Sequence, residues 1–246
     1  MAVLTIDELT ARVRGTDILK GVSLQIRSGE VDVLMGPNGS GKSTLAHVLM
    51  GNPAYEVTGG SVTFDDHDVL SLDPAERAQL GLFAALQYPN ELPGVTLTEL
   101  MTTVYQERGW DSADIDSAVR SEAAAVNLRG DLLDRSVNVG FSGGEKKRAE
   151  TVQLVLSRPR IAILDEIDSG LDVDALSDVS TRIEALTNDE DGDGPLGVLA
   201  ITHYTRLLNE LRGDRVHVFV NGRIVRTGGP ELADELEEVG YEAMAS

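Results

Sequence analysis

Residues 36–43, Gly-Pro-Asn-Gly-Ser-Gly-Lys-Ser, constrain the fold of this chain more than any other stretch. They match the spacing G-x-x-x-x-G-K-[S/T], and the apolar run Val31–Met35 before them predicts a buried strand. Residues 44–50 after them predict a helix. A strand, a glycine-rich turn and a helix in succession are typical of an α/β fold with a mostly parallel sheet. We therefore expect this unit to lie at the centre of the molecule.

The same loop is suited to a polyphosphate such as that of ATP. Its glycines let successive backbone N–H groups point inward, and the helix start adds the positive end of its dipole. We expect Lys42 to contact the outer phosphates and Ser43 to offer a hydroxyl to Mg²⁺, which prefers oxygen ligands. The candidate ATP-binding residues here are Gly36, Pro37, Asn38, Gly39, Ser40, Gly41, Lys42, Ser43 and Thr44.

The charge of the chain limits its partners. It carries 41 acidic and 21 basic residues among 246, a formal net charge of −20. Such a surface repels nucleic acid and anionic lipid, so we expect no nucleic acid as a partner. It is typical of halophilic proteins, in which salt screens the repulsion, although an acidic protein of an ordinary cytosol is the alternative. The chain has no cysteine, which excludes disulfides and thiolate ligands for an iron–sulfur cluster.

The sequence gives no sign of a membrane segment. It has no run of about eighteen apolar residues. Residues 1–7 lack the basic and apolar regions of a secretory signal. We expect a cytoplasmic protein without direct membrane insertion.

Patterns along the chain predict one domain, 1–246, with a core at about 1–90 and 158–246 and a helical subdomain at about 91–157. Strands are predicted at 3–6, 22–26, 61–64, 82–86, 161–164, 196–201, 216–220 and 223–226, the first of them antiparallel. Helices are predicted at 98–108, 112–126, 174–186, 204–211 and 230–239. Asp73, Pro74 and Glu76 predict a capped helix that ends at Gly81, and Asn221-Gly222 predicts a hairpin.

A second group of polar residues ends the apolar strand at 161–164. Asp165 and Glu166 are adjacent carboxylates, and in a phosphate-loop protein the strand's terminal aspartate lies near Mg²⁺. We expect Asp165 there, and Glu166 where it activates water as a general base. In a chain without a phosphate loop, the same two residues would be interpreted as exposed carboxylates in a loop.

Residues 141–145, Phe-Ser-Gly-Gly-Glu, precede a helix and form a second phosphate-binding pattern. They resemble the LSGGQ signature of the ABC ATPases. Gln87 resembles the Q-loop glutamine of that family, residues 169–172 its D-loop, and His203 its switch histidine. With the phosphate loop and the acidic strand, six motifs therefore appear in family order.

The resemblance implies an ATPase whose sites are shared between subunits. Ser142, Gly143 and Gly144 of one copy are expected to cover ATP on the phosphate loop of another, in a head-to-tail pair. Gln87 is expected to join Ser43 and Asp165 at Mg²⁺, and His203 to contact the terminal phosphate.

Further stretches are similar to the SufC group of ABC ATPases, the motor subunits of SUF iron–sulfur cluster assembly. These stretches are 56–60, 87–89, 93–95, 135–148, 164–176 and 202–204. Transport subunits usually read Glu-Pro-Thr where this chain has Glu166-Ile-Asp168. They usually have Gln-Gln-Arg after Gly-Gly, where this chain has Glu145-Lys-Lys-Arg148. The resemblance implies ATP-driven rearrangement of a SufB–SufD-type scaffold, with residues 88–95 as the docking surface.

Two alternatives remain open, a nucleotide-binding subunit of a membrane transporter and a non-catalytic ATP-gated scaffold. Glu166 and His203 weigh against the second. One departure from the family concerns the adenine base of ATP. Many ABC ATPases stack adenine on an aromatic side chain upstream of the phosphate loop, whereas residues 1–30 contain no aromatic side chain. Base binding is then expected either to be weak or to use an aliphatic contact such as Val13.

Overall fold

Strand β3 (Val31–Met35) lies inside a mixed sheet of order β10-β9-β3-β8-β7-β6 in the computed structural model, which describes residues 1–189, 194–203 and 206–244. The hairpin pair β9–β10 is antiparallel, and the other neighbours in this sheet are parallel. Its other strands are β6 (Leu82–Ala85), β7 (Ile161–Asp165), β8 (Gly197–Thr202), β9 (Arg215–Val220) and β10 (Arg223–Gly228). The expected α/β architecture with a mostly parallel sheet is therefore confirmed.

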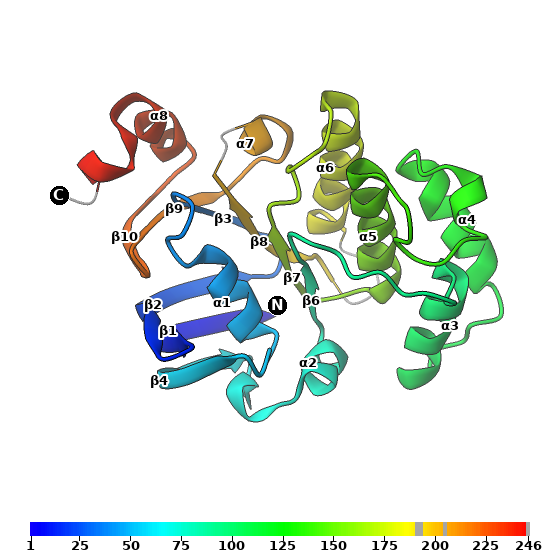
Figure 1. Ribbon diagram of the computed structural model, residues 1–246, viewed down its shortest axis with the longest axis horizontal. Helices are drawn as coiled ribbons and strands as arrows, with labels where there is room; N and C mark the ends of the chain where they lie inside the picture. Colours follow the sequence, from blue (N-terminus) through cyan, green and yellow to red (C-terminus); the bar gives the residue numbers. More distant parts are fainter. Residues whose placement is uncertain (190–193, 204–205, 245–246) are drawn as a thin grey trace.

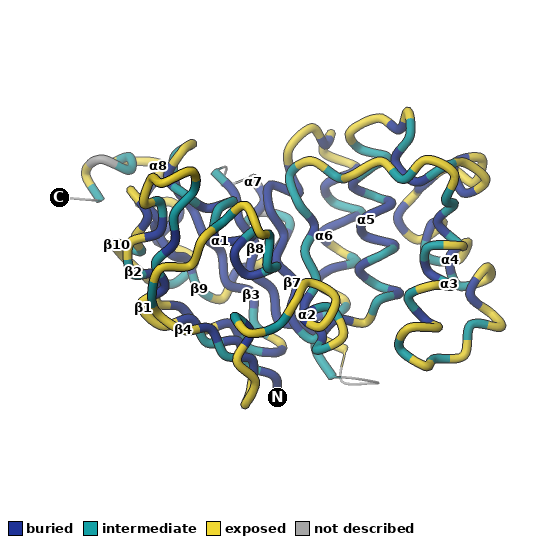
Figure 2. Tube along the Cα trace, turned by 60° about the horizontal axis from the view of Figure 1, so that its bottom comes forward, coloured by how far each residue is buried: buried dark blue, intermediate teal, exposed yellow. Residues whose placement is uncertain are grey.

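Both faces of this sheet are covered, as its near-continuous apolar strands require. Along β3, Leu34 faces the antiparallel sheet and α1, whereas Val33 and Met35 belong to the apolar cluster on the other face, with α6 and α8. Figure 2 shows these central strands buried, with exposed residues concentrated in the outer loops and helix faces. The central strands thus hold their carboxyl ends, where the polar motifs follow, in fixed positions.

The second sheet is antiparallel, in the order β2-β1-β4-β5, and lies at the lower left of Figure 1. Its strands are β1 (Val3–Val13), β2 (Thr16–Arg27), β4 (Tyr55–Phe64) and β5 (His67–Asp68). The strands predicted at 3–6, 22–26 and 61–64 were therefore too short. For β1 and β4 the cause is a bulge. Gly60 lies inside β4 with φ +82°, and a Cβ there would lie 2.4 Å from the carbonyl oxygen of Glu8.

Helices connect the strands and cover them (Figure 1). They are α1 (Lys42–Leu49), α2 (Pro74–Leu80), α3 (Leu97–Glu107), α4 (Ile115–Ala125), α5 (Gly143–Ser157), α6 (Val173–Thr187), α7 (Arg206–Glu210) and α8 (Glu231–Met244), with short 3₁₀ turns at Val69–Ser71 and Gly130–Leu132. The expected helix at 204–211 corresponds to α7, and its first two residues lie outside the described ranges. No helix in the described part of the chain has the length and apolar character needed to cross a membrane.

Two local predictions are confirmed in detail. The Asp73 carboxylate accepts from the N–H of Glu76 at 2.8 Å, the Glu76 carboxylate accepts from the N–H of Asp73 at 2.8 Å, and α2 stops at Gly81 with φ +110°. Asn221 and Gly222 have φ of 49° and 80°, as a tight hairpin turn requires. Such features depend on a few adjacent residues, which is why the sequence shows them.

Helices α3, α4 and α5 pack around a separate apolar cluster, toward the right of Figure 1. It includes Met101 on α3, Val119 on α4 and Val152 on α5, all nearly inaccessible to solvent. We call this group the α3–α5 cluster; it falls within the range 91–157 that we assign to the helical subdomain. Its α5 begins in the Ser-Gly-Gly motif, so this cluster carries the second phosphate-binding pattern.

Candidate active site

The glycine-rich loop runs from the end of β3 into α1, and two of its glycines are required by geometry. A Cβ at Gly36 would lie 2.1 Å from the carbonyl oxygen of Phe219. Gly41, which caps α1, has φ +107°, a conformation that glycine tolerates best. The N–H of Gly222 donates to the carbonyl of Ser40 at 2.8 Å and ties the loop to the β9–β10 hairpin. The loop is thereby fixed from both sides.

A cavity of about 410 Å³ opens over this loop. It is lined by Ile18, Asn38, Gly39, Gly41, Lys42, Ser43, Thr44, Gln87 and Glu166. Two candidate residues from elsewhere in the sequence, Gln87 and Glu166, thus share one site with the loop. Pro37 and Ser40 lie in the same turn, with the Ser40 side chain buried.

Lys42 is buried and folded back on the loop. Its Nζ donates to the carbonyl of Gly36 at 2.7 Å and to that of Pro37 at 3.1 Å. Burial lowers the pKa of Lys42, while the nearby negative charges of Glu166 and Asp165 act in the opposite direction. The ammonium group is therefore held where its charge reaches the cavity, with neutral acceptors that a phosphate can replace.

Asp165 ends β7 behind the loop, and its side chain is almost completely buried. Burial raises the pKa of this carboxyl, a hydrogen bond with Ser43 lowers it, and the charge of Glu166 raises it further. One carboxylate oxygen, Oδ1, is buried without a hydrogen-bond partner. A cation bound at this oxygen would satisfy it.

The donor set suits Mg²⁺. Ser43 and Asp165 offer a hydroxyl and a carboxylate, both hard oxygen ligands. Among the described residues no group of three or more His, Cys, Asp or Glu side chains is arranged to hold a metal. Magnesium bound with one or two protein oxygens, completed by phosphate and water, needs no such group.

Glu166 lies between two of the other candidate residues. Its Oε2 accepts from the Gln87 amide at 2.6 Å, and its Oε1 lies 3.3 Å from His203 Nδ1. The backbone of Glu166 has φ +51°, an uncommon conformation for a residue with a side chain. Its N–H donates to the carbonyl of Ile201 at 2.8 Å, which anchors this turn to β8. The neighbouring strands thus hold a strained residue that presents its carboxylate to the cavity.

The signature residues lie apart from this cavity, since Ser142, Gly143 and Gly144 are not among its lining. Ser142 caps α5, accepting from the N–H of Glu145 at 3.3 Å, while its own N–H donates to the Glu145 carboxylate at 2.8 Å. Ser142 and Gly143 are exposed to solvent. The tip of α5 is therefore preformed and available to another molecule.

The sequence reasoning did not identify two residues at or near the site. The aliphatic side chain at the cavity is Ile18 of β2, whereas Val13 is not part of the lining. The Asp168 carboxylate is buried and accepts from the Thr202 hydroxyl at 3.1 Å, directly before His203. The signal for Asp168 was its departure from the Glu-Pro-Thr of transport subunits. No local pattern indicates Ile18, because its position depends on how β2 packs beside the loop.

The family described as ABC transporter matches residues 19–169, more than half of the chain. The chain belongs to the ABC ATPase family. This ABC ATPase is 47% identical over 247 residues to the "Probable ATP-dependent transporter ycf16" of Cyanophora paradoxa, covering 98% of this chain and 93% of that protein. It is 46% identical over 246 residues to "Vegetative protein 296" of Bacillus subtilis, covering 98% of this chain and 92% of that protein.

Solved structures agree on the fold of this ABC ATPase. A structure described as the ATP-binding subunit of an ABC transporter superimposes with a TM-score of 0.79 at 23% identity, covering 97% of this chain and 94% of the other. The ABC ATPase domain binds ATP, and the cavity over residues 36–43 is the candidate site for it.

Proposed function

We propose that this ABC ATPase hydrolyses ATP at the cavity over its phosphate loop. The observation that carries this proposal is the position of the Glu166 carboxylate, at the cavity that Lys42 also lines and within reach of Gln87 and His203. In that role Glu166 removes a proton from the attacking water, and His203 contacts the terminal phosphate. Lys42 and the loop N–H groups stabilise the charge of the phosphates.

Magnesium is part of this proposal. Ser43 and Asp165 would hold the ion, with Gln87 as a third ligand through its amide oxygen. When bound, Mg²⁺ neutralises charge on the phosphate oxygens. The buried Asp165 oxygen without a partner supports this assignment.

We further propose that two copies pair head to tail around ATP. The Ser142–Gly143 tip is exposed and is not part of the cavity on its own chain, so it fits the second half of another copy's site. The free N–H groups at the start of α5 suit the phosphates of that nucleotide. Two such sites arise by symmetry in one pair.

We propose that this ABC ATPase drives conformational change in a SufB–SufD-type scaffold that assembles iron–sulfur clusters. The support is the sequence at Glu145–Arg148 and Glu166–Asp168, and the absence of cysteine, as expected of a subunit that holds no cluster. Residues 88–95 are the proposed docking surface. Tyr88, next to Gln87, is 80% exposed, so a bulky ring is available to a partner.

A membrane transporter is the second candidate, because relatives are named as an ATP-dependent transporter and as an ABC transporter ATP-binding protein. Affinity capture of the chain from its native cells, with iron analysis of the eluate, tests the two. Soluble partners with iron support the scaffold. A co-purified membrane protein without iron supports the transporter. A non-catalytic scaffold predicts no phosphate release even with partners present.

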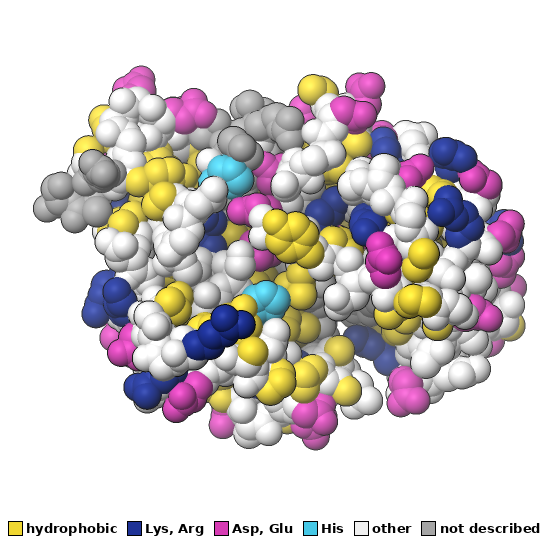
Figure 3. Space-filling view, viewed as in Figure 1, with side chains coloured by type: hydrophobic (Ala, Val, Ile, Leu, Met, Phe, Trp, Pro, Cys, Tyr) yellow, Lys and Arg dark blue, Asp and Glu magenta, His cyan; other side chains and the backbone are white. Residues whose placement is uncertain are grey.

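We also propose a cytoplasmic protein adapted to high salt. The net charge of −20 supports the second part, and acidic side chains lie along much of the rim of the face in Figure 3. Salt screens the repulsion between them.

A further inference from the structure

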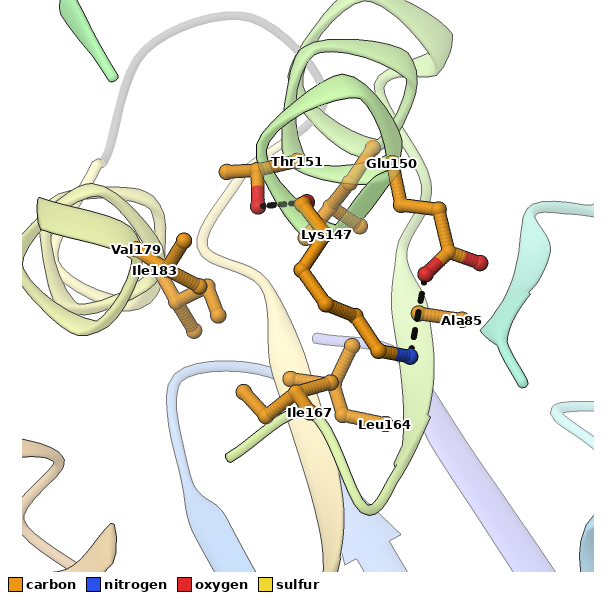
Figure 4. A pocket seen from close by; sticks show the side chains of 9 residues that line it. Ala85, Lys147, Glu150, Thr151, Leu164, Ile167, Val179 and Ile183 are labelled. Atoms are coloured by element: carbon orange, nitrogen blue, oxygen red, sulfur yellow. Dashed lines mark hydrogen bonds and ion pairs between the residues drawn. The ribbon is translucent and has the colours of Figure 1, made fainter. Parts of the chain in front are cut away.

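A buried ion pair on α5 contacts the end of strand β6 (Figure 4). Lys147 Nζ lies 3.1 Å from Glu150 Oε2, with side chains only 5% and 11% exposed. The pair is enclosed by apolar side chains that include Ala85 of β6, Leu164 of β7 and Val179 of α6. In such surroundings neither charge can turn to water, so the pair keeps one geometry as long as the core stays packed.

The pair holds the backbone of one residue, Leu86. Lys147 Nζ donates to the carbonyl of Leu86 at 2.8 Å. Burial raises the pKa of Glu150, while the charge of Lys147, its hydrogen bond and a backbone hydrogen bond from Leu86 act against that rise. The carbonyl of Leu86, which belongs to the peptide bond with Gln87, is therefore held by a side chain of α5.

Leu86 is the residue before Gln87, whose amide donates to Glu166 at 2.6 Å. The same helix begins at Ser142 and Gly143, four to five residues before Lys147. Helix α5 therefore connects two places in the chain. Its first residues form the exposed tip that we propose meets a second copy, and its Lys147 contacts Leu86, the residue before Gln87.

We propose that Lys147 and Glu150 are positioning residues that fix the peptide of Leu86 and thereby aim Gln87 at Glu166. Movement of α5, for example when its tip meets a second copy's nucleotide, then moves Gln87 in the chain's own cavity. This inference rests on the proposed function for its kinetic consequence. Its structural part, the hold on Leu86, stands without that function.

The structural part is tested by hydrogen exchange in the full-length protein without partners. The double variant Lys147→Met/Glu150→Leu removes both charges, a change that buried pairs often tolerate. We expect the amides of residues 86–88 to exchange about tenfold faster, since the Leu86 carbonyl loses its donor and the segment is held less firmly.

The matched control is Arg182→Met/Glu122→Leu. That ion pair joins α4 to α6, at 2.8 Å, and makes no hydrogen bond with Leu86. We expect it to leave exchange at residues 86–88 unchanged. If the first double variant does not fold, Glu150→Ala serves instead, because it removes the ion-pair partner that holds Lys147 beside Leu86. Unchanged exchange at Leu86 in the folded variant would overturn the proposal.

The kinetic part is tested in two backgrounds. In the wild type, we expect Lys147→Met/Glu150→Leu to lower kcat about tenfold with little change in KM for ATP. In a Gln87→Ala background the same double substitution should cause no further loss, because the side chain that it aims is gone. A merely structural role would lower kcat equally in both backgrounds and would overturn the inference.

The two proposals fail separately. A wild-type protein that releases no phosphate with its partners contradicts the proposed function, yet exchange at Leu86 still tests the hold on that peptide. A wild type that hydrolyses ATP while the double variant behaves identically contradicts only the role given to Lys147 and Glu150.

Discussion

The amide nitrogen of Gln87 lies 2.6 Å from the carboxylate of Glu166, although the two residues are 79 positions apart in the chain. Because of this contact, the carboxylate that we assign as the base is held by the segment leading to the proposed docking surface. We therefore expect a partner that moves this segment to change the position or the exposure of Glu166.

Substitution of Glu166 separates binding from hydrolysis. We expect Glu166→Gln to bind ATP and to accumulate as closed pairs, with hydrolysis reduced by about 10² to 10⁴-fold, because the amide cannot accept the water's proton. Lys42→Ala, in contrast, should bind ATP poorly, since it removes the buried cation of the loop. Gel filtration with ATP and phosphate release measure the two effects. Wild-type turnover by Glu166→Gln contradicts the role of that carboxylate.

Mixing two inactive chains tests the shared site. Lys42→Ala lacks a working loop and Ser142→Glu lacks a working tip, so each alone should be inactive. A mixed head-to-tail pair contains one intact site, built from the loop of one chain and the tip of the other. We expect phosphate release to appear on mixing. If each chain contained a whole site, the mixture would stay inactive.

Arg77 stabilises the C-terminal end of α1, the helix that follows the phosphate loop. Its Nη1 donates to the carbonyls of Val48 and Leu49 at the end of α1, both at 2.8 Å, and the side chain is buried. Arg77→Met leaves these acceptors without partners, at a cost of about 2–3 kcal/mol in the free energy of unfolding. Urea denaturation measures it. Arg12→Met, which removes a half-exposed ion pair with Asp17, is the control and should cost less than about 1 kcal/mol.

A buried group of charged residues around Asp32 of β3 predicts how the stability of the fold depends on pH. Burial raises the pKa of Asp32, but its bonds to His217 at 2.9 Å and Arg215 at 2.8 Å outweigh that effect and lower it below 3.8. The Asp32 carboxylate then binds a proton less tightly in the native state than in the unfolded state. The stabilisation is present above about pH 3.8 and is lost as the pH falls through the lower native value.

Asp32→Asn should therefore lower the free energy of unfolding by about 3–5 kcal/mol at pH 7, because it leaves the two basic side chains with a neutral partner. The difference from the wild type should shrink below pH 4. Urea denaturation at several pH values checks both statements. A difference that stays constant with pH contradicts the ionised state of Asp32.

The acidic surface predicts a dependence on salt. We expect the thermal midpoint to rise between 0.1 and 3 M KCl, because ions screen repulsion among charges that sum to −20. The exposed triple variant Glu56→Gln/Glu107→Gln/Glu184→Gln should rise less. A thermal midpoint that does not increase with KCl removes the proposed adaptation to high salt.

Local sequence signals predicted local structure well. Residues 36–43, the Asp73–Glu76 box and Asn221-Gly222 each specify a conformation through a few adjacent side chains. The lengths of β1 and β4 were underestimated for the opposite reason. The bulge at Gly60 depends on Glu8, a residue on another strand, and alternation of side chains is interrupted there.

The sequence by itself determined that this chain has a phosphate loop, an acidic strand end and a Ser-Gly-Gly helix start in family order. The reason is that glycines, caps and apolar runs act on the backbone within a few residues. Only the tertiary structure decided that Lys147, paired with Glu150, contacts the Leu86 carbonyl, that Gln87 contacts Glu166 and that Ile18 lines the cavity. Those contacts join residues from different elements, and their geometry follows from the packing of sheet and helices rather than from any single stretch.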